Sequence, residues 1–581
     1  MDFIRNVFAV VVGLFIFSII SFFGFIIIVG AITSASNGQV QVKDNAVMYL
    51  NLTGEVHELI PDEPLAELFE EPPRISLLNT VDALREAQDD DRIKGLHINV
   101  GLFSSGYASL TELRDAIIEF KSKGKFVYAY GEFYSEKAYY LTSVADSIFI
   151  HPEGSLEFNG ISANVSFFQG ALEKLNIEAQ IFRAGDFKSA VEPFMRKDLS
   201  DENRLQLEEW LTTLNEELLD QISASRDIPI DQLREISSSM LVTNSKTAQE
   251  YGLINGRRYT DQVKTTINNT LGQAIDDDIN FIAAQDYYQN WRSTASLPSD
   301  RIAVVVAEGE IMGGEGDNYQ VGSKKFVSTI RKLRENELIK AMVIRINSPG
   351  GGMTASDAIW REITLAKDKM PVIASMGDYA TSGGYYLAMP CDEIVSQPTS
   401  LTGSIGVFGM LFNFGPFLSD KLGITHDVVK TGEYSDIFTV TRSLNLEERE
   451  IIQKEVLGSY ETFIDKAANG RGVANEDIKE IASGRIWAGS TALELNLVDK
   501  QGGLSEALNM AARSAELEEY QVVYYPEQKT FFEELMSGFG SRVKTRLFSD
   551  LGIFEPYRAV LDKVKSYRGI QARMPFELEI N

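Results

Sequence analysis

A serine flanked by small residues lies in a run that could carry nucleophilic chemistry. Ser382 opens the sequence Ser-Gly-Gly-Tyr-Tyr at 382–386, after a strand-like segment and a turn. A glycine-rich turn, Asn-Ser-Pro-Gly-Gly-Gly at 347–352, follows the preceding strand-like segment. Such a turn directs backbone N–H groups outward, which suits an oxyanion hole or a phosphate site. Because the turn lacks the Lys-Ser/Thr end of a nucleotide-binding loop, the sequence favours a nucleophile beside an oxyanion hole.

A serine nucleophile needs a base, and no histidine is an obvious candidate. The four histidines have no HExxH spacing and offer no plausible His-Asp pair: His57, His97, His151 and His426, the last in a strand-like context. A lysine can take this role where burial lowers its pKa, because burial penalises the charged form. Lys188 lies among small and apolar neighbours in Gly-Asp-Phe-Lys-Ser-Ala at 185–190, after a strand-like stretch over 179–182.

An internal repeat distinguishes Lys188 from the other lysines. The run 377–387 is echoed at 131–141, an offset of 377 − 131 = 246, which places Glu136 where the second half has Ser382. The segment 183–188 is echoed at 430–435, which places Ser435 where the first half has Lys188. One copy keeps the nucleophile and the other keeps the candidate base. The pattern predicts one active site assembled between two half-sites.

Both halves alternate strand-like apolar runs with helix-period segments. We predict strands over 47–52, 96–100, 126–130, 147–150, 302–307, 341–346 and 372–376. We predict helices over 76–88, 109–120, 202–223, 326–335, 354–366 and 446–468. This alternation is typical of α/β units with right-handed crossovers. The offset is far too long for a solenoid, so the repeat is a duplication of a whole domain.

The sequence divides into four predicted parts. Residues 1–42 form an N-terminal anchor, 43–292 the first repeat domain with Lys188, and 293–520 the second repeat domain with Ser382. Residues 521–581 are expected to lie beyond the repeat, as a tail without a counterpart. The tail could be an oligomer-contact segment or a surface extension.

The anchor prediction rests on the absence of charge between Arg5 and Lys43. The nearly apolar stretch 7–32 would span about 39 Å as a helix at ~1.5 Å per residue, enough for a ~30 Å hydrocarbon core. A cleaved signal peptide is the alternative, but its apolar region is usually only ~7–15 residues long. The positive charge at Arg5 favours a cytoplasmic N-terminus. In a bacterium this places a single-pass protein in the inner membrane with its body on the periplasmic side.

Composition excludes several function classes. The 581 residues carry a net charge of −28, which argues against nucleic-acid partners because those require a basic surface. A single cysteine, Cys391, permits neither an intrachain disulfide nor a thiolate metal cluster. We expect no cofactor and no metal.

Four motifs together resemble one known family, signal peptide peptidase A, or protease IV. They are Asn-Ser-Pro-Gly-Gly at 347–351, Ser-Gly-Gly-Tyr-Tyr at 382–386, Leu-Thr-Gly-Ser-Ile-Gly at 401–406 and Gly-Asp-Phe-Lys-Ser-Ala at 185–190. The resemblance covers nearly the whole chain, duplication and anchor included, and fits the long form of the family. It implies an α/β structure of two tandem Clp-protease/crotonase-like domains.

The resemblance also implies a mechanism and partners. Ser382 would be the nucleophile, Lys188 the general base and Ser404 the group that orients the lysine, while the N–H groups of Gly383 and Gly351 would form the oxyanion hole. The family implies a membrane-bound serine endopeptidase, a homotetramer, that degrades cleaved signal peptides and other extended peptides.

Two other classes of function remain as alternatives. A crotonase-like acyl-CoA enzyme also polarises a carbonyl with paired N–H groups, but it needs neither an anchor nor a Ser/Lys pair. A catalytically silent membrane scaffold is possible because duplicated folds host unrelated functions. The presence of Ser382, Lys188 and Ser404 argues against the scaffold.

Overall fold

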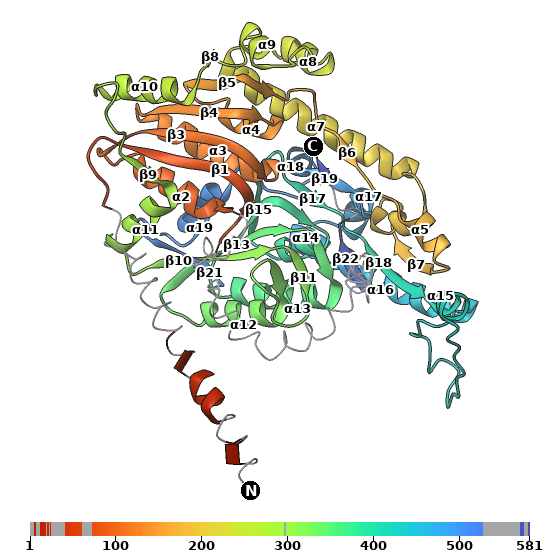
Figure 1. Cartoon of the computed structure of the whole chain (residues 1–581). Helices are drawn as coiled ribbons and strands as arrows, with labels where there is room; N and C mark the ends of the chain where they lie inside the picture. The colour runs from red at the N-terminus through yellow and green to blue at the C-terminus, as the bar shows by residue number, and fades with distance from the viewer. Residues whose placement is uncertain are drawn as a thin grey trace.

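The computed structural model describes most of the chain outside its termini. The described residues are 41–60, 73–294, 298–526, 570–574 and 579–580, with scattered positions between 5 and 24. Within them the two halves lie side by side, the first in orange to yellow and the second in green to blue (Figure 1).

The first half is built around a parallel sheet of order β2-β1-β3-β4-β5-β8, with β9 paired to β1. Its strands are β1 (Ala46–His57), β2 (Arg74–Ser76), β3 (Ile93–Ser104), β4 (Phe126–Tyr134), β5 (Ser147–Leu156), β6 (Ala163–Asn164), β7 (Glu178–Ala184), β8 (Gly256–Arg257) and β9 (Phe281–Ala283). Its helices are α2 (Leu77–Ala87), α3 (Tyr107–Ser122), α4 (Glu136–Thr142), α5 (Gln169–Lys174), α6 (Glu192–Met195), α7 (Asp201–Arg226), α8 (Ile230–Ser238), α9 (Ser245–Glu250), α10 (Thr260–Leu271) and α11 (Ala284–Thr294).

The second half repeats the plan in a sheet of order β19-β17-β15-β13-β10-β21, in which only β19 runs antiparallel to its neighbour. Its strands are β10 (Arg301–Glu308), β11 (Glu310–Met312), β12 (Gln320–Gly322), β13 (Ile339–Ser348), β14 (Gly350–Gly352), β15 (Val372–Thr381), β16 (Glu393–Ser396), β17 (Leu401–Gly403), β18 (Val407–Asn413), β19 (Ile486–Ala488), β20 (Lys500–Gln501), β21 (Gln521–Tyr525), β22 (Ile570–Arg573) and β23 (Glu579–Ile580). Its helices are α12 (Ser323–Arg334), α13 (Met353–Lys367), α14 (Gly383–Ala388), α15 (Gly415–Leu422), α16 (Leu446–Arg471), α17 (Asn475–Ile481), α18 (Gly489–Glu494) and α19 (Leu504–Ser514).

The predicted strands and helices are confirmed, each within a few residues except where strands run on at their ends. Local chemistry fixes several boundaries. Ser76 caps α2 by accepting a hydrogen bond from the Asn79 N–H, and Asn445 with Glu448 forms a capping box at the start of α16. The strand context predicted for His426 is wrong, because this residue lies in an exposed segment without regular structure.

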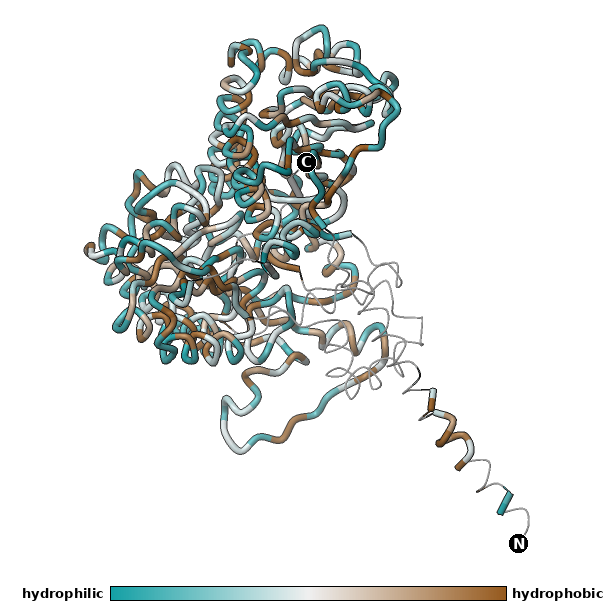
Figure 2. Tube along the Cα trace, turned by 90° about the vertical axis from the view of Figure 1, so that its left-hand side faces the viewer, coloured by the Kyte–Doolittle hydropathy of each residue, from teal (hydrophilic) through white to brown (hydrophobic). Residues whose placement is uncertain are grey.

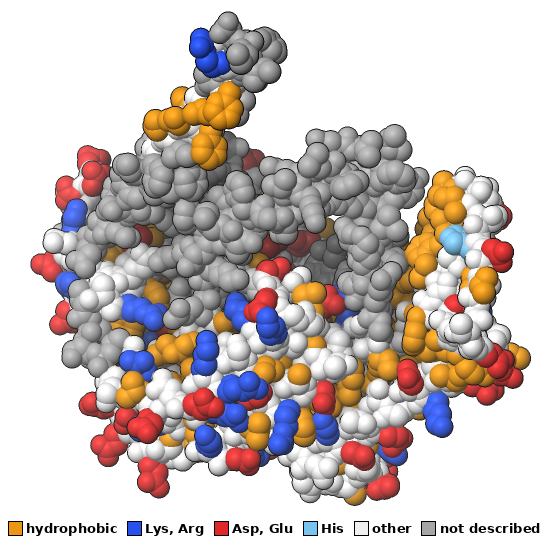
Figure 3. All heavy atoms as spheres, turned by 90° about the horizontal axis from the view of Figure 1, so that it is seen from below, with side chains coloured by type: hydrophobic (Ala, Val, Ile, Leu, Met, Phe, Trp, Pro, Cys, Tyr) orange, Lys and Arg blue, Asp and Glu red, His pale blue; other side chains and the backbone are white. Residues whose placement is uncertain are grey.

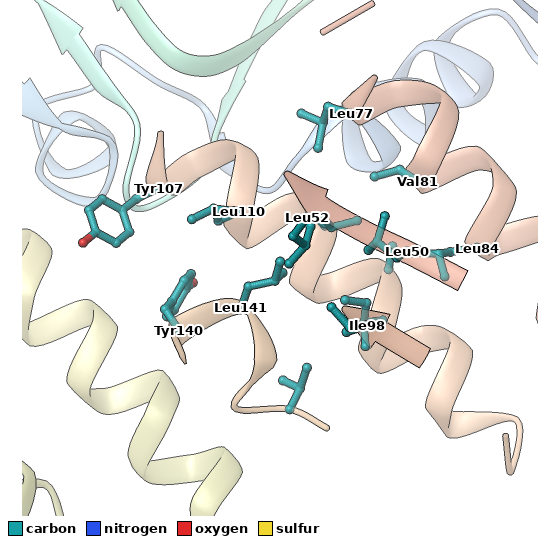
Figure 4. Close-up of a cluster of buried hydrophobic side chains, with 14 of the residues drawn as sticks. Leu50, Leu52, Leu77, Val81, Leu84, Ile98, Tyr107, Leu110, Tyr140 and Leu141 are labelled. Carbon is teal, nitrogen blue, oxygen red and sulfur yellow. The ribbon is translucent and has the colours of Figure 1, made fainter. Parts of the chain in front are cut away.

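The core of the first half lies between its sheet and the helices that cover it. Leucines of β1 pack against α2 and α3, as the labelled side chains of Figure 4 show, and Tyr140 and Leu141 of α4 lie close by. These side chains are almost fully buried, and burial of each aliphatic one stabilises the fold by roughly 1.5–3 kcal/mol. A rigid sheet therefore supports the loops at its strand ends.

A buried charge cluster joins the two halves. Arg345 of β13 donates to the Glu58 carboxylate over 3.0 Å and to the Glu112 carboxylate over 2.6 Å. All three side chains are buried, and the Leu504 N–H also donates to Glu112. Burial raises the pKa of Glu58 to about 7, although the adjacent Arg345 opposes this shift. The halves are thus connected by paired charges as well as by apolar packing.

A third sheet, of order β12-β11-β14-β22-β18-β7, crosses between the halves. In it β7 of the first half pairs antiparallel with β18 of the second, from Ala184 opposite Val407 to Glu178 opposite Asn413. A short sheet of β6 and β23 stands apart.

The end of the repeat predicted near Gln521 is one strand too early. β21 pairs with β10 in parallel as β9 pairs with β1, so the duplication extends through Tyr525. The strand was missed because its few residues lie at a sheet edge and give little periodicity. Further along the predicted tail, β22 lies inside the third sheet rather than on the surface.

One segment projects from the body after α15 (Figure 1). We call residues 423–438 the arm. It exposes hydrophobic side chains, among them Ile424, Val428, Val429 and Phe438. Figure 3 shows hydrophobic side chains gathered along a projection from the body.

The predicted membrane anchor falls largely outside the described residues. Those described near the N-terminus are mostly hydrophobic (Figure 2). No helix within the described part of the chain has both the length and the apolar character needed to span a bilayer.

Candidate active site

Ser382 lies at the junction of β15 and α14. Its backbone has φ of +54°, a left-handed conformation that is uncommon for a residue other than glycine. The Ser382 N–H donates to the Gly403 carbonyl over 2.8 Å, which holds the sharp turn in place. Strained backbone of this kind is concentrated at functional sites. The side chain is fully buried.

The Lys188 amine lies directly beside this serine. Its Nζ is 2.7 Å from Ser382 Oγ, 3.0 Å from Ser404 Oγ and 3.1 Å from the Ser404 carbonyl oxygen. Among the described residues no carboxylate pairs with this amine. Because Lys188 is completely buried, desolvation lowers its pKa well below the ordinary value.

The β7–β18 pairing carries Lys188 from the first half into the second. After β7 ends at Ala184, the chain turns and its Phe187 N–H donates to the Ser483 carbonyl over 3.0 Å. Gly484, with φ of +81°, makes this approach possible, because a Cβ there would lie only 2.6 Å from the Lys188 Cβ. The lysine backbone is therefore clamped against the second half.

Ser404 is fixed by its own backbone. It also has a left-handed φ, +52°, and its N–H donates to the Arg485 carbonyl over 2.7 Å. The hydroxyl and the carbonyl of this one residue both accept from Lys188, so the amine is oriented by two bonds.

The two predicted oxyanion glycines lie next to each other. Gly351 is in β14, and Gly383 opens α14 directly after Ser382. A Cβ on Gly383 would lie 3.0 Å from the Gly351 nitrogen, and one on Gly350 would lie 2.8 Å from the Gly383 nitrogen. Any side chain would obstruct this corner, which explains the glycine-rich composition of both runs.

The residues that the repeat aligns with Ser382 and Lys188, namely Glu136 and Ser435, do not form a second site. Glu136 begins α4 and accepts hydrogen bonds from the Asn159 and Gly160 N–H groups at 3.4 and 3.1 Å. Burial raises the pKa of this carboxyl to about 7. Ser435 lies exposed on the arm, where its hydroxyl donates to the Gly432 carbonyl. The structure thus brings together all five predicted site residues in one place and leaves their echoes apart.

Comparison with known proteins identifies the repeated domain. Peptidase family S49 matches residues 119–273 and 364–518, two segments separated by 364 − 119 = 245 positions, close to the offset of the internal repeat. "Serine protease SPPA, chloroplastic" from Arabidopsis thaliana is 32% identical over 92% of this chain and 78% of its own length.

The chain belongs to peptidase family S49. It carries the family's domain twice in tandem and is a serine peptidase. A second relative, "Protease 4" from Salmonella typhi, is 34% identical over 81% of this chain and 77% of its own length. "Putative signal peptide peptidase SppA" from Enterococcus faecium is 32% identical over 42% of this chain and 69% of its own.

Sequence reasoning missed the residues that hold the two halves of this peptidase together. Arg345 interrupts the otherwise apolar stretch 341–346, and its counterpart in the first half is Asn99 (345 − 246 = 99). This difference between the two repeats is the sequence signal that could have identified Arg345. Asp378 was also missed. Its carboxylate accepts hydrogen bonds from both the N–H and the hydroxyl of Ser109, at 2.9 and 2.5 Å, and so joins the two halves.

Proposed function

We propose that this S49 peptidase cleaves peptide bonds with Ser382 as nucleophile and Lys188 as general base. The observation that carries the proposal is the 2.7 Å contact between the buried Lys188 Nζ and Ser382 Oγ, where no carboxylate of the described residues pairs with the amine. A neutral amine at this distance is within reach of the hydroxyl proton.

The reaction follows from these positions. Lys188 takes the proton of Ser382 as Oγ attacks the peptide carbonyl, and the N–H groups of Gly351 and Gly383 stabilise the oxyanion. The lysine then gives its proton to the leaving amine, and a water molecule hydrolyses the acyl-enzyme with the same base. Ser404 keeps the amine directed at Ser382 throughout.

The substrates we propose are cleaved signal peptides and other extended peptides. The name of the Enterococcus faecium relative supports the first class. The facing edges of β14 and β18 support the second, because in this structure they hold an extended strand, β22, between them, and strand edges bind extended chains by main-chain hydrogen bonds.

We further propose that the body is held at a membrane by residues 1–42, on the periplasmic side if the cell is bacterial. The uncharged stretch between Arg5 and Lys43 supports the anchor. We do not favour the acyl-CoA or scaffold alternatives, because neither requires the Lys188 contact with Ser382.

Assembly into a homotetramer completes the proposal. The echo of 183–188 at 430–435 makes residues 425–431 of the arm the counterparts of β7 (178 + 247 = 425; 184 + 247 = 431). β7 pairs with β18, whereas 425–431 pair with no strand in the described part of the chain. We propose that the arm pairs with the first half of a second copy near β6, which produces a head-to-tail interface that can close into a ring.

A double-mutant cycle tests the Ser/Lys pair. Ser382→Ala, Lys188→Ala and the double variant should show nearly equal residual hydrolysis of a quenched peptide, because residues that act as one unit are strongly non-additive. Ser404→Ala should lose roughly five- to hundredfold, since the main-chain carbonyl still accepts from Lys188. If the double variant loses the product of the two single effects, the residues do not act together. Labelling of wild-type Ser382 by a fluorophosphonate is the control for an intact pocket.

A further inference from the structure

A strand from the far end of the chain lies over the two oxyanion glycines. β22 pairs antiparallel with β14, with Gly351 opposite Ala572, and also with β18, with Phe408 opposite Gln571. The segment thus fills the space between the two strand edges that the proposed function assigns to an extended peptide.

The register of β22 can be derived from one hydrogen bond. The Met574 N–H donates to the Pro349 carbonyl over 2.6 Å. Bonded and non-bonded pairs alternate along an antiparallel ladder, so the next bonded pair is Gly351 with Ala572. The Gly351 N–H therefore faces the Ala572 carbonyl.

The second oxyanion donor lies beside the same carbonyl. The Ala572 oxygen is 2.9 Å from the point where a Cβ on Gly383 would stand, and 2.3 Å from the corresponding point on Gly350. This is the place that a carbonyl under attack by Ser382 would occupy. The bond between Ala572 and Arg573 thus corresponds to the bond to be cleaved.

Side chains on either side of that bond have different surroundings. Ala572 is fully buried in the core of the second half, which leaves room for a small side chain only. Arg573 Nη1 donates to Glu310 Oε1 over 3.0 Å. Glu310 lies on β11, whose next residue Ile311 pairs with Gly351, so this carboxylate flanks the oxyanion strand.

Directly after Arg573 the chain reaches a cavity. Met574 lines a cavity of about 560 Å³ between the halves, together with Tyr107, Lys137, Pro349 and Tyr379. A longer peptide could therefore continue past the cleaved bond.

We propose that β22 occupies the groove between β14 and β18 as a substrate does, and that its own residues resemble those of the peptides that the groove selects. The selected peptide has a small residue before the cleaved bond and a cationic residue after it, and Glu310 is the specificity-determining side chain for the cation. This inference rests on the proposed Ser/Lys peptidase function.

The test uses the full-length protein in detergent and two quenched peptides, which contain Ile-Gln-Ala-Arg-Met or Ile-Gln-Ala-Glu-Met. Both peptides displace the same β22, so its competition cancels in the ratio of their kcat/KM values. Wild type should prefer the arginine peptide roughly ten- to hundredfold, as expected for a charge-assisted hydrogen bond. Glu310→Lys should reverse the preference. Glu315→Lys is the matched control, because Glu315 is exposed and pairs with Lys324 instead.

A third variant tests whether β22 is displaced. Arg573→Glu sets two carboxylates face to face, so it should weaken the hold on β22 and raise kcat/KM for both peptides by the same factor. Unchanged or lowered rates would show that β22 is a permanent strand and would overturn the proposal. So would equal cleavage of the two peptides by wild type, or a ratio that Glu310→Lys leaves unchanged. Cleavage that survives Ser382→Ala would instead refute the proposed function itself.

Discussion

Lys188 can act as a base only when its amine is neutral, and burial is what favours that state. An ordinary lysine is neutral in roughly one molecule in two thousand at pH 7. Here the amine is surrounded by two serines and no described carboxylate, so nothing offsets the desolvation that lowers its pKa. The serine hydroxyls orient the amine but carry no negative charge that would hold its proton.

This arrangement predicts the sign of the pH dependence. Activity should be low in acid and should rise with pH as Lys188 loses its proton, with the midpoint well below the pKa of a solvated lysine. Lys188→Arg should be as inactive as Lys188→Ala, because guanidinium stays charged. The measurement is kcat/KM for a peptide from about pH 5 to 9. Lys454→Arg, at an exposed position of α16, is the control. A flat wild-type profile, or an active Lys188→Arg enzyme, would refute the role of the lysine.

At the level of elements, the duplication explains why the site needs both halves. β7 brings Lys188, the proposed base, to Ser382 only because it pairs with β18 of the other half. The buried Arg345 cluster and the Asp378–Ser109 contact fix the two sheets relative to each other near the strand ends that carry Ser382 and Gly351.

The charge cluster itself can be tested. Arg345→Met should lower the free energy of unfolding by about 3–5 kcal/mol, because it leaves Glu58 and Glu112 buried without their cation. The loss should shrink toward pH 5, since a carboxyl whose pKa is raised in the folded state takes up a proton there. Unfolding midpoints of the purified protein measure the effect. Lys123→Met, which breaks a solvent-exposed pair with Asp89, should cost less than about 1 kcal/mol. Equal losses in the two variants would contradict the structural role of the cluster.

The sequence predicts regular elements well where hydrophobic periodicity is long, as in α3 or β13, and less well where strands are short. β21 and β22 contribute only a few residues each, and their strand pairing depends on distant partners rather than on local pattern. The site was predictable because its residues fall in repeated runs whose differences are informative. Glu310 was not, because its importance depends on Arg573, 263 residues away.

At the scale of the whole molecule, the arm predicts association. Val429→Asp together with Val428→Asp should reduce the particle mass measured by light scattering in detergent, because charge would be placed on the hydrophobic surface that we assign to the interface. Met240→Asp, at an exposed position of the first half, should leave the mass unchanged. An unaltered mass in the arm variant would exclude the arm from the interface.

The proposed anchor predicts in which cell fraction the protein is found. The full chain should sediment with membranes and resist carbonate extraction, whereas deletion of residues 1–42 should release a folded body that still cleaves peptides. Protease added from outside the cytoplasmic membrane should digest the body. Protection on that side, with digestion from the cytoplasm, would reverse the orientation.

The 2.7 Å contact between Lys188 and Ser382 lies within one polypeptide, although the two residues come from different repeats. The ring that we propose would therefore contain as many independent catalysts as copies. Two inactive alleles, one without the serine and the other without the lysine, could assemble together and still not complement each other. A single wild-type copy in a mixed ring would keep its own full turnover. Because both repeats lie in one chain, inactive variants of this peptidase should behave in genetic complementation like variants of a monomeric enzyme, whatever the size of the particle.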